Sequence, residues 1–351
     1  MRMNAKVNLY VGIILLLLSC QKFDNKSFNQ PVLELQNPLQ FVGWCTIPVP
    51  SSVPVQSQTH PSVVYIPDTF MHSTIWIATT PYPKGNIAFE NPCVYFNNRS
   101  SYIHFFPIKS NPIHDRPLAP NAYNSDVDIL YFNHRLYSIV RECWNGKYAR
   151  EIKVQSSMDG QKWSDAVHVY SSNDVKGKEL LSPSIIYYDN AFYIYHLNGN
   201  SGNDPTAKCL GIEIMKGSNL DNPDFKFYQA GRFLNQDTLQ IEPWHFDLFI
   251  YKRILWMVLC APDHSHGPTT KMFTYLAYSN NFADFTILKK PLVSDHSTYR
   301  PTAFIDENGV FYLYFSILDS PEGDGRAIGV KKCDFESLLQ YLNYYKDPSQ
   351  L

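Results

Sequence analysis

Apolar runs recur five times along the chain, and each begins just after a small polar or charged cluster. They start at intervals of roughly 55 to 65 residues, which is typical of repeated structural units, and they lie at residues 60–65, 126–131, 182–187, 245–250 and 300–305. Each run is followed by a turn and an aromatic-rich strand, at residues 75–78, 136–139, 192–195, 255–258 and 311–314. One such sheet cannot bury both of its faces alone, whereas five sheets closed into a ring can. The pattern therefore predicts an all-β fold, a five-bladed β-propeller.

Helical periodicity is confined to the end of the chain. Between residues 334 and 345 the apolar side chains share one face of a helix, at Phe335, Leu338, Leu339 and Leu342. This spacing predicts a short C-terminal helix that packs on the outside of the ring.

The first residues have the features of an export signal. Arg2 and Lys6 precede an apolar run at residues 9–18 that is too short to span a membrane as a mature helix. The run ends in Leu-Leu-Ser-Cys, which resembles a bacterial lipobox and implies a lipid on Cys20. We therefore expect a lipoprotein signal peptide at 1–20, a tether at 21–43 and the propeller domain at 44–351. The alternative is an ordinary signal peptide. The lipid would anchor the protein in the bacterial cell envelope, at the outer membrane, in the periplasm or exposed on the surface.

Composition narrows the classes of partner. The net charge of −2 favours neither nucleic acid nor an acidic membrane surface. Aromatic residues make up 15% of the 351 residues and charged residues 18%, which suits a large β-rich core. The cysteines after Cys20 show no paired metal-binding spacing, so we expect buried free thiols. We expect a monomer that uses no cofactor and holds no metal.

Polar residues at the five strand openings fall into two columns. The first column holds His60, Asp126, Ser182, His245 and Arg300, and the second, two residues later, holds Ser62, Asp128, Ser184, Asp247 and Thr302. Residues two apart point to the same face of a strand, and the first strand of each propeller blade lines the central funnel. The columns therefore predict two stacked polar rings in one pocket that takes a polar ligand such as a sugar.

Other interpretations of these residues stay open. Asp126 and Asp128 could cap loop amides, and His60 and His245 could be ordinary core histidines. Arg300 could be a structural ion-pair partner. We favour a site role for Asp128, because Asp247 repeats it in another blade.

Hydrolysis of a glycosidic bond usually needs two carboxyl groups, one of them a proton donor. Glu142 follows the second strand of the second repeat, Glu242 precedes the fourth opening, and Glu90 lies after the first repeat's second strand. Glu242 is the preferred acid, because Trp244 beside it could exclude water, whereas Arg141 could pair with Glu142 and lower its pKa.

The openings of the type Pro-Ser-Val followed by an aromatic strand resemble those of the five-bladed propeller glycosidases. These include glycoside hydrolase family 43 and the invertase-like families. The resemblance covers nearly all of the chain after the tether and implies hydrolysis of a polysaccharide or oligosaccharide. The segment 157–163 also resembles the Asp box of sialidase-like blades, in which an Asp and a Gly form a tight turn and a Trp packs back on the blade. Residues 279–285 resemble a degraded copy of it.

The chain departs from the family pattern at two of three positions. In family 43 the first blade opens on Asp-Pro, whose Asp is the general base, but here it opens on His60-Pro61. The second-blade Asp that tunes the acid falls on Asp128. The third-blade opening, Ser182-Pro183-Ser184, has no glutamate close behind it.

Two functions therefore remain open. Either the carboxylates have been redistributed, with Asp128, Glu242 and Glu142 as the catalytic candidates and His60, Asp126, His245, Asp247 and Arg300 as substrate-binding residues, or the chain is a glycan-binding propeller without turnover. A weaker alternative is a metal centre that uses His60 and His245 with Asp128 or Asp247.

Overall fold

The structure is a computed structural model that describes residues 35–97, 101–119, 122–144, 150–172, 179–199, 209–262, 271–317 and 326–344. Residues 36–351 belong to one compact unit. The predicted signal peptide, Cys20 and the tether up to residue 34 lie outside the described residues.

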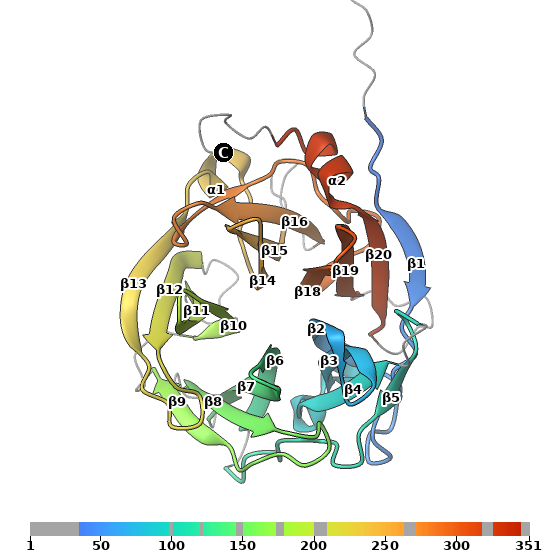
Figure 1. Cartoon of the computed structure of the whole chain (residues 1–351), viewed down its shortest axis with the longest axis vertical. Helices are drawn as coiled ribbons and strands as arrows, with labels where there is room; N and C mark the ends of the chain where they lie inside the picture. Colours follow the sequence, from blue (N-terminus) through green and yellow to red (C-terminus); the bar gives the residue numbers. More distant parts are fainter. Residues whose placement is uncertain are drawn as a thin grey trace, which may run out of the picture. The chain divides into compact units, whose positions relative to one another are not determined.

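The described strands form the predicted five-bladed propeller (Figure 1). Each blade is built from four strands in antiparallel order. Blade 1 consists of β2 (Gln58–Phe70), β3 (Ser73–Pro81), β4 (Cys93–Asn97) and β5 (Phe105–Pro107). Blade 2 consists of β6 (Tyr123–Phe132), β7 (Arg135–Cys143), β8 (Arg150–Ser157) and β9 (Val167–Ser171). Blade 3 consists of β10 (Leu181–Tyr188), β11 (Ala191–Gly199), β12 (Cys209–Gly217) and β13 (Lys226–Phe233).

The remaining two blades complete the ring. Blade 4 consists of β14 (His245–Tyr251), β15 (Ile254–Pro262), β16 (Met272–Ser279) and β17 (Asp284–Ile287). Blade 5 consists of β18 (Thr298–Ile305), β19 (Val310–Ile317), β20 (Ile328–Asp334) and β1 (Gln40–Trp44). The five predicted apolar runs are the inner strands β2, β6, β10, β14 and β18, which surround the central axis in Figure 1.

The chain closes the ring by pairing its two ends. Strand β1 pairs with β20, so the first described strand supplies the outer edge of the last blade. Residues 40–43, which the sequence pattern assigns to the tether, are therefore part of the propeller. Their short, weakly alternating sequence gives little indication of a strand, because the pairing partner lies almost 300 residues away in sequence. Blades 3 and 4 are further joined by a parallel pairing of β13 with β17.

The predicted Asp box is confirmed. Asp159 accepts hydrogen bonds from the backbone N–H groups of Gln161 and Lys162, both at 2.8 Å, and Gly160 takes a left-handed conformation against the ring of buried Trp76. Residues 279–285 repeat this turn with Asn281 in the place of the Asp. Its side-chain oxygen accepts from the N–H groups of Ala283 and Asp284. The copy keeps its hydrogen bonds because an amide oxygen accepts as a carboxylate does.

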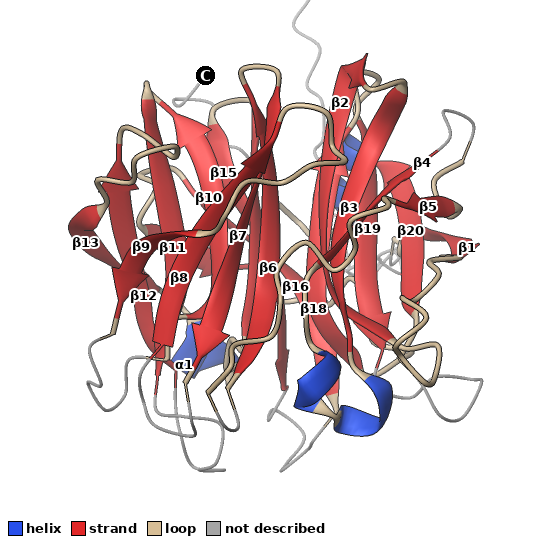
Figure 2. Cartoon of the chain, turned by 90° about the horizontal axis from the view of Figure 1, so that it is seen from below, coloured by secondary structure: helices blue, strands red, loops and turns tan. Residues whose placement is uncertain are grey.

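Helices are few among the described residues, as the side view of Figure 2 shows. The predicted C-terminal helix is α2 (Phe335–Tyr341), which Asp334 caps by accepting from the N–H of Ser337 at 2.8 Å. The other helical turns are α1 (Gln236–Leu239), η1 (Pro83–Gly85) and η2 (Ile87–Phe89). None of the helices in the described ranges has the length and apolarity needed to cross a membrane.

The predicted free thiols are also confirmed where the structure describes them. Cys93, Cys143, Cys260 and Cys333 are buried and unpaired, and Cys45 is partly buried and unpaired. All five therefore act as small packing residues of the blades.

Candidate functional site

The second polar column forms a belt that ties the five blades together. Side-chain oxygens of Ser62, Asp128, Ser184 and Thr302 each accept a backbone N–H from the next blade, at 3.0, 2.7, 3.2 and 3.0 Å respectively. The remaining junction is made by Asp247, which accepts the hydroxyl proton of Thr302. The belt also contains hydrogen bonds from Ser62 to Asp128 and from Ser184 to Asp247. Most of its polar atoms are therefore engaged in holding the ring closed.

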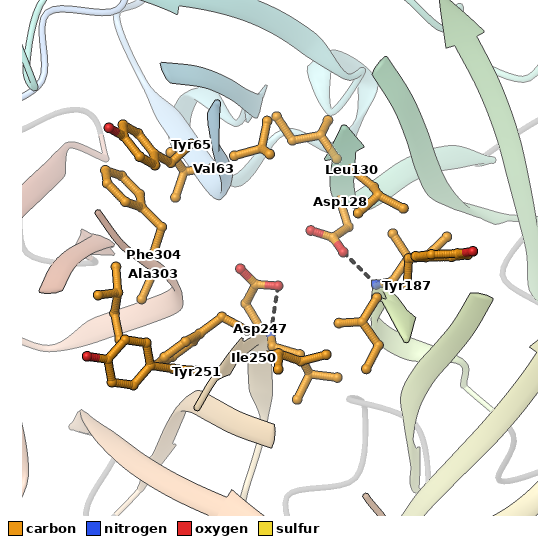
Figure 3. Close-up of a pocket in the computed structure, with 17 residues that line it drawn as sticks. Val63, Tyr65, Asp128, Leu130, Tyr187, Asp247, Ile250, Tyr251, Ala303 and Phe304 are labelled. Carbon is orange, nitrogen blue, oxygen red and sulfur yellow. Dashed lines mark hydrogen bonds between the residues drawn. The ribbon is translucent and has the colours of Figure 1, made fainter. Parts of the chain in front are cut away.

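The two carboxylates of the belt face a pocket on one side of it. This pocket, of about 290 Å³, is lined by the later residues of the inner strands and is shown in Figure 3. Asp128 and Asp247 point toward its middle, and its walls are aliphatic and aromatic side chains that include Tyr65 and Tyr187. Burial, followed by the charge of Asp247, raises the pKa of Asp128 to about 7. Burial also raises the pKa of Asp247.

The first column does not line this pocket. The sequence pattern predicts both polar rings in a single pocket, but the pocket in Figure 3 holds Asp128 and Asp247 without His60, Asp126, His245 or Arg300. The reason is local. At His60, Asp126 and Ser182 the strand register shifts, and each residue takes a left-handed backbone conformation with φ of 50°, 51° and 54°. These bulges redirect the first-column side chains in blades 1, 2 and 3, so that the two columns are no longer equivalent there.

Asp126 is the centre of the first column. Its Oδ1 lies 3.4 Å from Nε2 of His60, 3.4 Å from Nδ1 of His245 and 3.7 Å from Nη1 of Arg300. Its Oδ2 lies 3.0 Å from Nη2 of Arg141 and accepts the N–H of Ser182 at 3.1 Å. Burial by itself would raise the pKa of this carboxyl. The surrounding cations, above all Arg141, outweigh that effect and hold its pKa well below the usual range.

His60, Asp126 and His245 together have the composition of a metal site. One ligand atom from each lies within 4.8 Å of the others, and all three residues are buried. Zinc bonds of about 2.1 Å in a tetrahedral arrangement place neighbouring ligand atoms about 3.4 Å apart, which is the separation of Asp126 Oδ1 from each imidazole nitrogen. Asp126 Oδ1, His60 Nε2 and His245 Nδ1 also lack hydrogen-bond partners. The donor set therefore fits a divalent cation, and we call these residues the trio.

The protonation of the two histidines suits the same role. Burial lowers the pKa of His60 to about 3 and that of His245 well below its usual value, so both rings are neutral. His60 Nδ1 lies 3.1 Å from Oε1 of Glu90 and 2.8 Å from Oγ1 of Thr80. A proton on Nδ1 shared with these oxygens leaves Nε2 with a free lone pair toward Asp126.

Glu90 is a part of the centre to which the sequence gives little weight. The short turn η2 brings it from the loop after β3 to His60, and Ser125 donates a hydrogen bond to its Oε1 at 2.7 Å. Burial raises the pKa of Glu90 to about 8. Its approach depends on the path of a loop, which strand periodicity does not reveal.

Aromatic rings border the trio. The ring of Tyr299 lies 4.5 Å from that of His245 and 5.3 Å from that of His60, and the Trp244 ring lies 5.9 Å from His245. Tyr299 precedes the first-column residue Arg300 in the chain. Arg300 itself is fully buried and donates to the carbonyl of Pro183 at 3.2 Å, which places its charge between the trio and the belt.

The two preferred glutamates are placed differently. Glu142 lies 2.9 Å from Nζ of Lys153 and 3.2 Å from Nε2 of His114. Burial tends to raise its pKa, but these two partners more than offset this and lower it, which is the opposite of what a general acid needs. Pairing with Arg141, the alternative that the sequence leaves open, does not form, because Arg141 turns to Asp126 and to the carbonyl of Glu179. Glu242 is half-buried and lies three residues before His245.

Comparison with known proteins identifies the fold. No family model matches the chain, and no curated protein matches it. Among solved structures, it is similar to an N-acetylgalactosamine deacetylase from F. plautii in complex with blood group B trisaccharide, with a TM-score of 0.72 and 18% identity over 88% of this chain and 100% of that one.

Two glycoside hydrolases show the same likeness at lower scores. A family 117 enzyme from the marine bacterium Zobellia galactanivorans has a TM-score of 0.56 and 12% identity, covering 90% of this chain and 94% of its own. A GH43_1 enzyme from Xanthomonas citri, complexed with xylotriose, has a TM-score of 0.56 and 13% identity, covering 79% and 86%. These likenesses confirm the predicted propeller fold, which this chain shares with carbohydrate-acting hydrolases.

Proposed function

We propose that this protein is a carbohydrate-directed hydrolase whose reaction centre is a divalent cation held by His60, Asp126 and His245. The observation that carries the proposal is the convergence of three ligand atoms that have no hydrogen-bond partner, with Asp126 Oδ1 at the spacing of a coordination shell from each imidazole nitrogen. When bound, such a cation acts as a Lewis acid toward a carbonyl oxygen. Glu90 and Thr80 hold the Nδ1 side of His60, and Arg141 orients Asp126.

The bond that best fits this centre is an acyl bond on a sugar, as in an N-acetyl or O-acetyl group. Hydrolysis breaks the bond between the acyl carbon and the sugar nitrogen or oxygen. Water supplies the oxygen of the released carboxylate and the proton of the leaving group. The deacetylase likeness supports this choice. The carboxylates of the centre support it as well, because Asp126 of the trio and the neighbouring Glu90 are both engaged with His60 and its neighbours rather than facing each other across open space.

A second candidate is hydrolysis of a glycosidic bond, the activity that the sequence predicts. The likeness to family 43 and family 117 enzymes favours it. Glu90, rather than Glu142, would then be the proton donor, since a donor must keep its proton near neutral pH. Asp128 and Glu242 stay catalytic predictions under this candidate.

Product analysis separates the candidates. The purified protein is treated with a chelator, reloaded with Zn²⁺ or Mn²⁺, and assayed for acetate and for reducing ends on N-acetylgalactosamine oligosaccharides and acetylated xylan. We expect cation-dependent acetate release that falls by roughly 10²-fold in His60→Ala and His245→Ala, and is unchanged in the matched control His168→Ala, an exposed histidine of blade 2. Chelator-resistant release of reducing ends would favour the glycosidase, and no product from any glycan would favour the binding propeller.

We also propose that the protein is exported and anchored as a monomer by a lipid on Cys20, in keeping with the Leu-Leu-Ser-Cys sequence that follows a basic and apolar leader. Cys20→Ala should accumulate as an unprocessed precursor. Processing and membrane association equal to wild type would overturn the lipid anchor.

A further inference from the structure

A guanidinium group lies beside the trio and, among the described residues, makes no ion pair with a carboxylate within 4.0 Å, although its charge acts on Glu90. Arg326 precedes β20, and its Cζ lies 4.5 Å from the centre of the Tyr82 ring and 4.8 Å from that of Tyr299. Tyr299 in turn contacts both histidines of the trio. The side chain of Tyr299 therefore lies between Arg326 and the proposed reaction centre.

The backbone around Arg326 is fixed. Its N–H donates to Oγ of Ser57 at 3.0 Å, and its carbonyl accepts the N–H of Gln58 at 3.0 Å. The side chain donates from Nη1 to Oγ1 of Thr59 at 3.3 Å. Residues at the start of blade 1 thus hold both the backbone and the side chain of Arg326, which lowers the conformational entropy lost when Arg326 binds a ligand.

The guanidinium of Arg326 carries more hydrogen-bond donors than its contacts use. It has five N–H donors in one plane, and among the described residues one of them is bonded, to Thr59. Arg326 is half-buried, and Thr59 takes one donor. A guanidinium with free donors suits a ligand group that carries two oxygens, because bidentate pairing with a carboxylate or sulfate is a strong interaction of arginine.

We propose that Arg326 selects an acidic glycan, by binding a carboxylate or sulfate group of the sugar that occupies the centre. The proposal rests on the proposed function, since it names the substrate class of the same site. Tyr82 and Tyr299 pack beside the guanidinium, and the anion binds the donors that Thr59 does not take. Neutral glycans lack this contact and bind more weakly.

Binding measured without catalysis tests the proposal. Titration calorimetry on chelator-treated protein compares trigalacturonate, a glucuronate-containing tetrasaccharide and a sulfated galactan oligosaccharide with neutral galactotriose. We expect at least one acidic glycan to bind about 10-fold or more tightly than galactotriose. The carboxylated and sulfated arms show which anion is preferred. We expect Arg326→Met to lose that preference and Arg326→Lys to keep part of it, because lysine retains the charge but not the fork.

A matched control is Arg135→Met. Arg135 also stacks on a tyrosine, Tyr137, but on the β6–β7 hairpin and with Asp221 as its ion-pair partner. It should leave glycan preference unchanged. Unfolding midpoints of all variants check the fold. The proposal would be overturned if wild type bound acidic and neutral glycans equally, or bound no acidic glycan at all. It would also be overturned if a folded Arg326→Met kept the acidic preference. An acidic preference together with no acyl hydrolysis would leave this inference standing and overturn the proposed function.

Discussion

Left-handed backbone at His60 and Asp126 is the residue-level feature that positions two of the trio, and Ser182 repeats it in blade 3. For a residue other than glycine, this sparsely populated backbone conformation costs roughly 1–3 kcal/mol of folding free energy. At Asp126 the cost is offset by Arg141 and the N–H of Ser182, and at Ser182 by hydrogen bonds with the backbone of Phe246. Strain of this kind recurs at equivalent positions in three blades, and it therefore belongs to the way in which these inner strands enter the ring.

Residue patterns predicted part of this centre. The first column placed His60, Asp126 and His245 together because residues at equivalent strand openings converge on the propeller axis. The pattern could not separate the two columns, since the bulges that do so depend on pairing with the second strands. It did not place Tyr299, Arg141 or Arg326 near the centre, because their proximity is tertiary. Asp128 stays a site prediction, and the structure adds that the same residue also accepts a hydrogen bond in the belt that joins the blades.

Glu142 provides a test at the residue scale. Its pKa is lowered by His114 and Lys153, so the ionised form stabilises the fold above the unfolded pKa near 4.5, and this contribution is lost as the pH falls through the lowered folded value. We expect Glu142→Gln to reduce the free energy of unfolding by about 1–3 kcal/mol at pH 7, with the difference from wild type shrinking toward pH 3. Chemical denaturation across this pH range measures it.

The matched control is Glu151→Gln, which changes the more exposed carboxylate near the same Lys153 and should cost less than about 1 kcal/mol. Turnover should be unchanged in Glu142→Gln. A loss of turnover that is greatest on substrates with poor leaving groups would restore Glu142 as the acid.

Closure of the five-bladed ring depends on the inner strands, because each of them provides a side-chain hydrogen-bond acceptor for a donor in the next blade. Alternating apolar and polar residues predicted these strands well, since one column must face the axis. The edge strand β1 was not predicted, because its short sequence becomes a strand through pairing with β20 rather than through its own pattern.

Thr302 tests the belt at the element scale. It accepts the N–H of Val63 and donates to Asp247, and so joins blade 5 to blades 1 and 4. The isosteric change Thr302→Val leaves a buried N–H and a buried carboxylate with one partner fewer. We expect a loss of about 2–4 kcal/mol in the free energy of unfolding, the sum of two such penalties. Thr286→Val, on the partly exposed strand β17, is the control. Equal stability of the two variants would mean that the belt does not hold the ring.

Closure of the whole molecule relies on the joining of its two ends in blade 5. The repeat count predicted five blades because the strands were spaced regularly, but it could not show how the ring closes. The pairing of β1 with β20 covers the outer edge of blade 5, and the pairing of β13 with β17 adds backbone hydrogen bonds between blades 3 and 4 to the side-chain belt.

Removal of β1 tests this closure. A chain that begins at Thr46 lacks β1 and exposes the edge of β20, so we expect a much lower melting temperature and a broader transition than for a chain that begins at Leu35. Circular dichroism during heating measures both. A shortened chain that melts as cooperatively and as late as the longer one would show that the ring closes without β1.

The most direct test of the central claim is an anomalous diffraction map of crystals soaked in Zn²⁺. We predict one strong peak on the propeller axis, about 2.0–2.2 Å from Oδ1 of Asp126 and from one nitrogen each of His60 and His245. A map with no peak at these residues, or with its only axial peak between Asp128 and Asp247, would contradict the account.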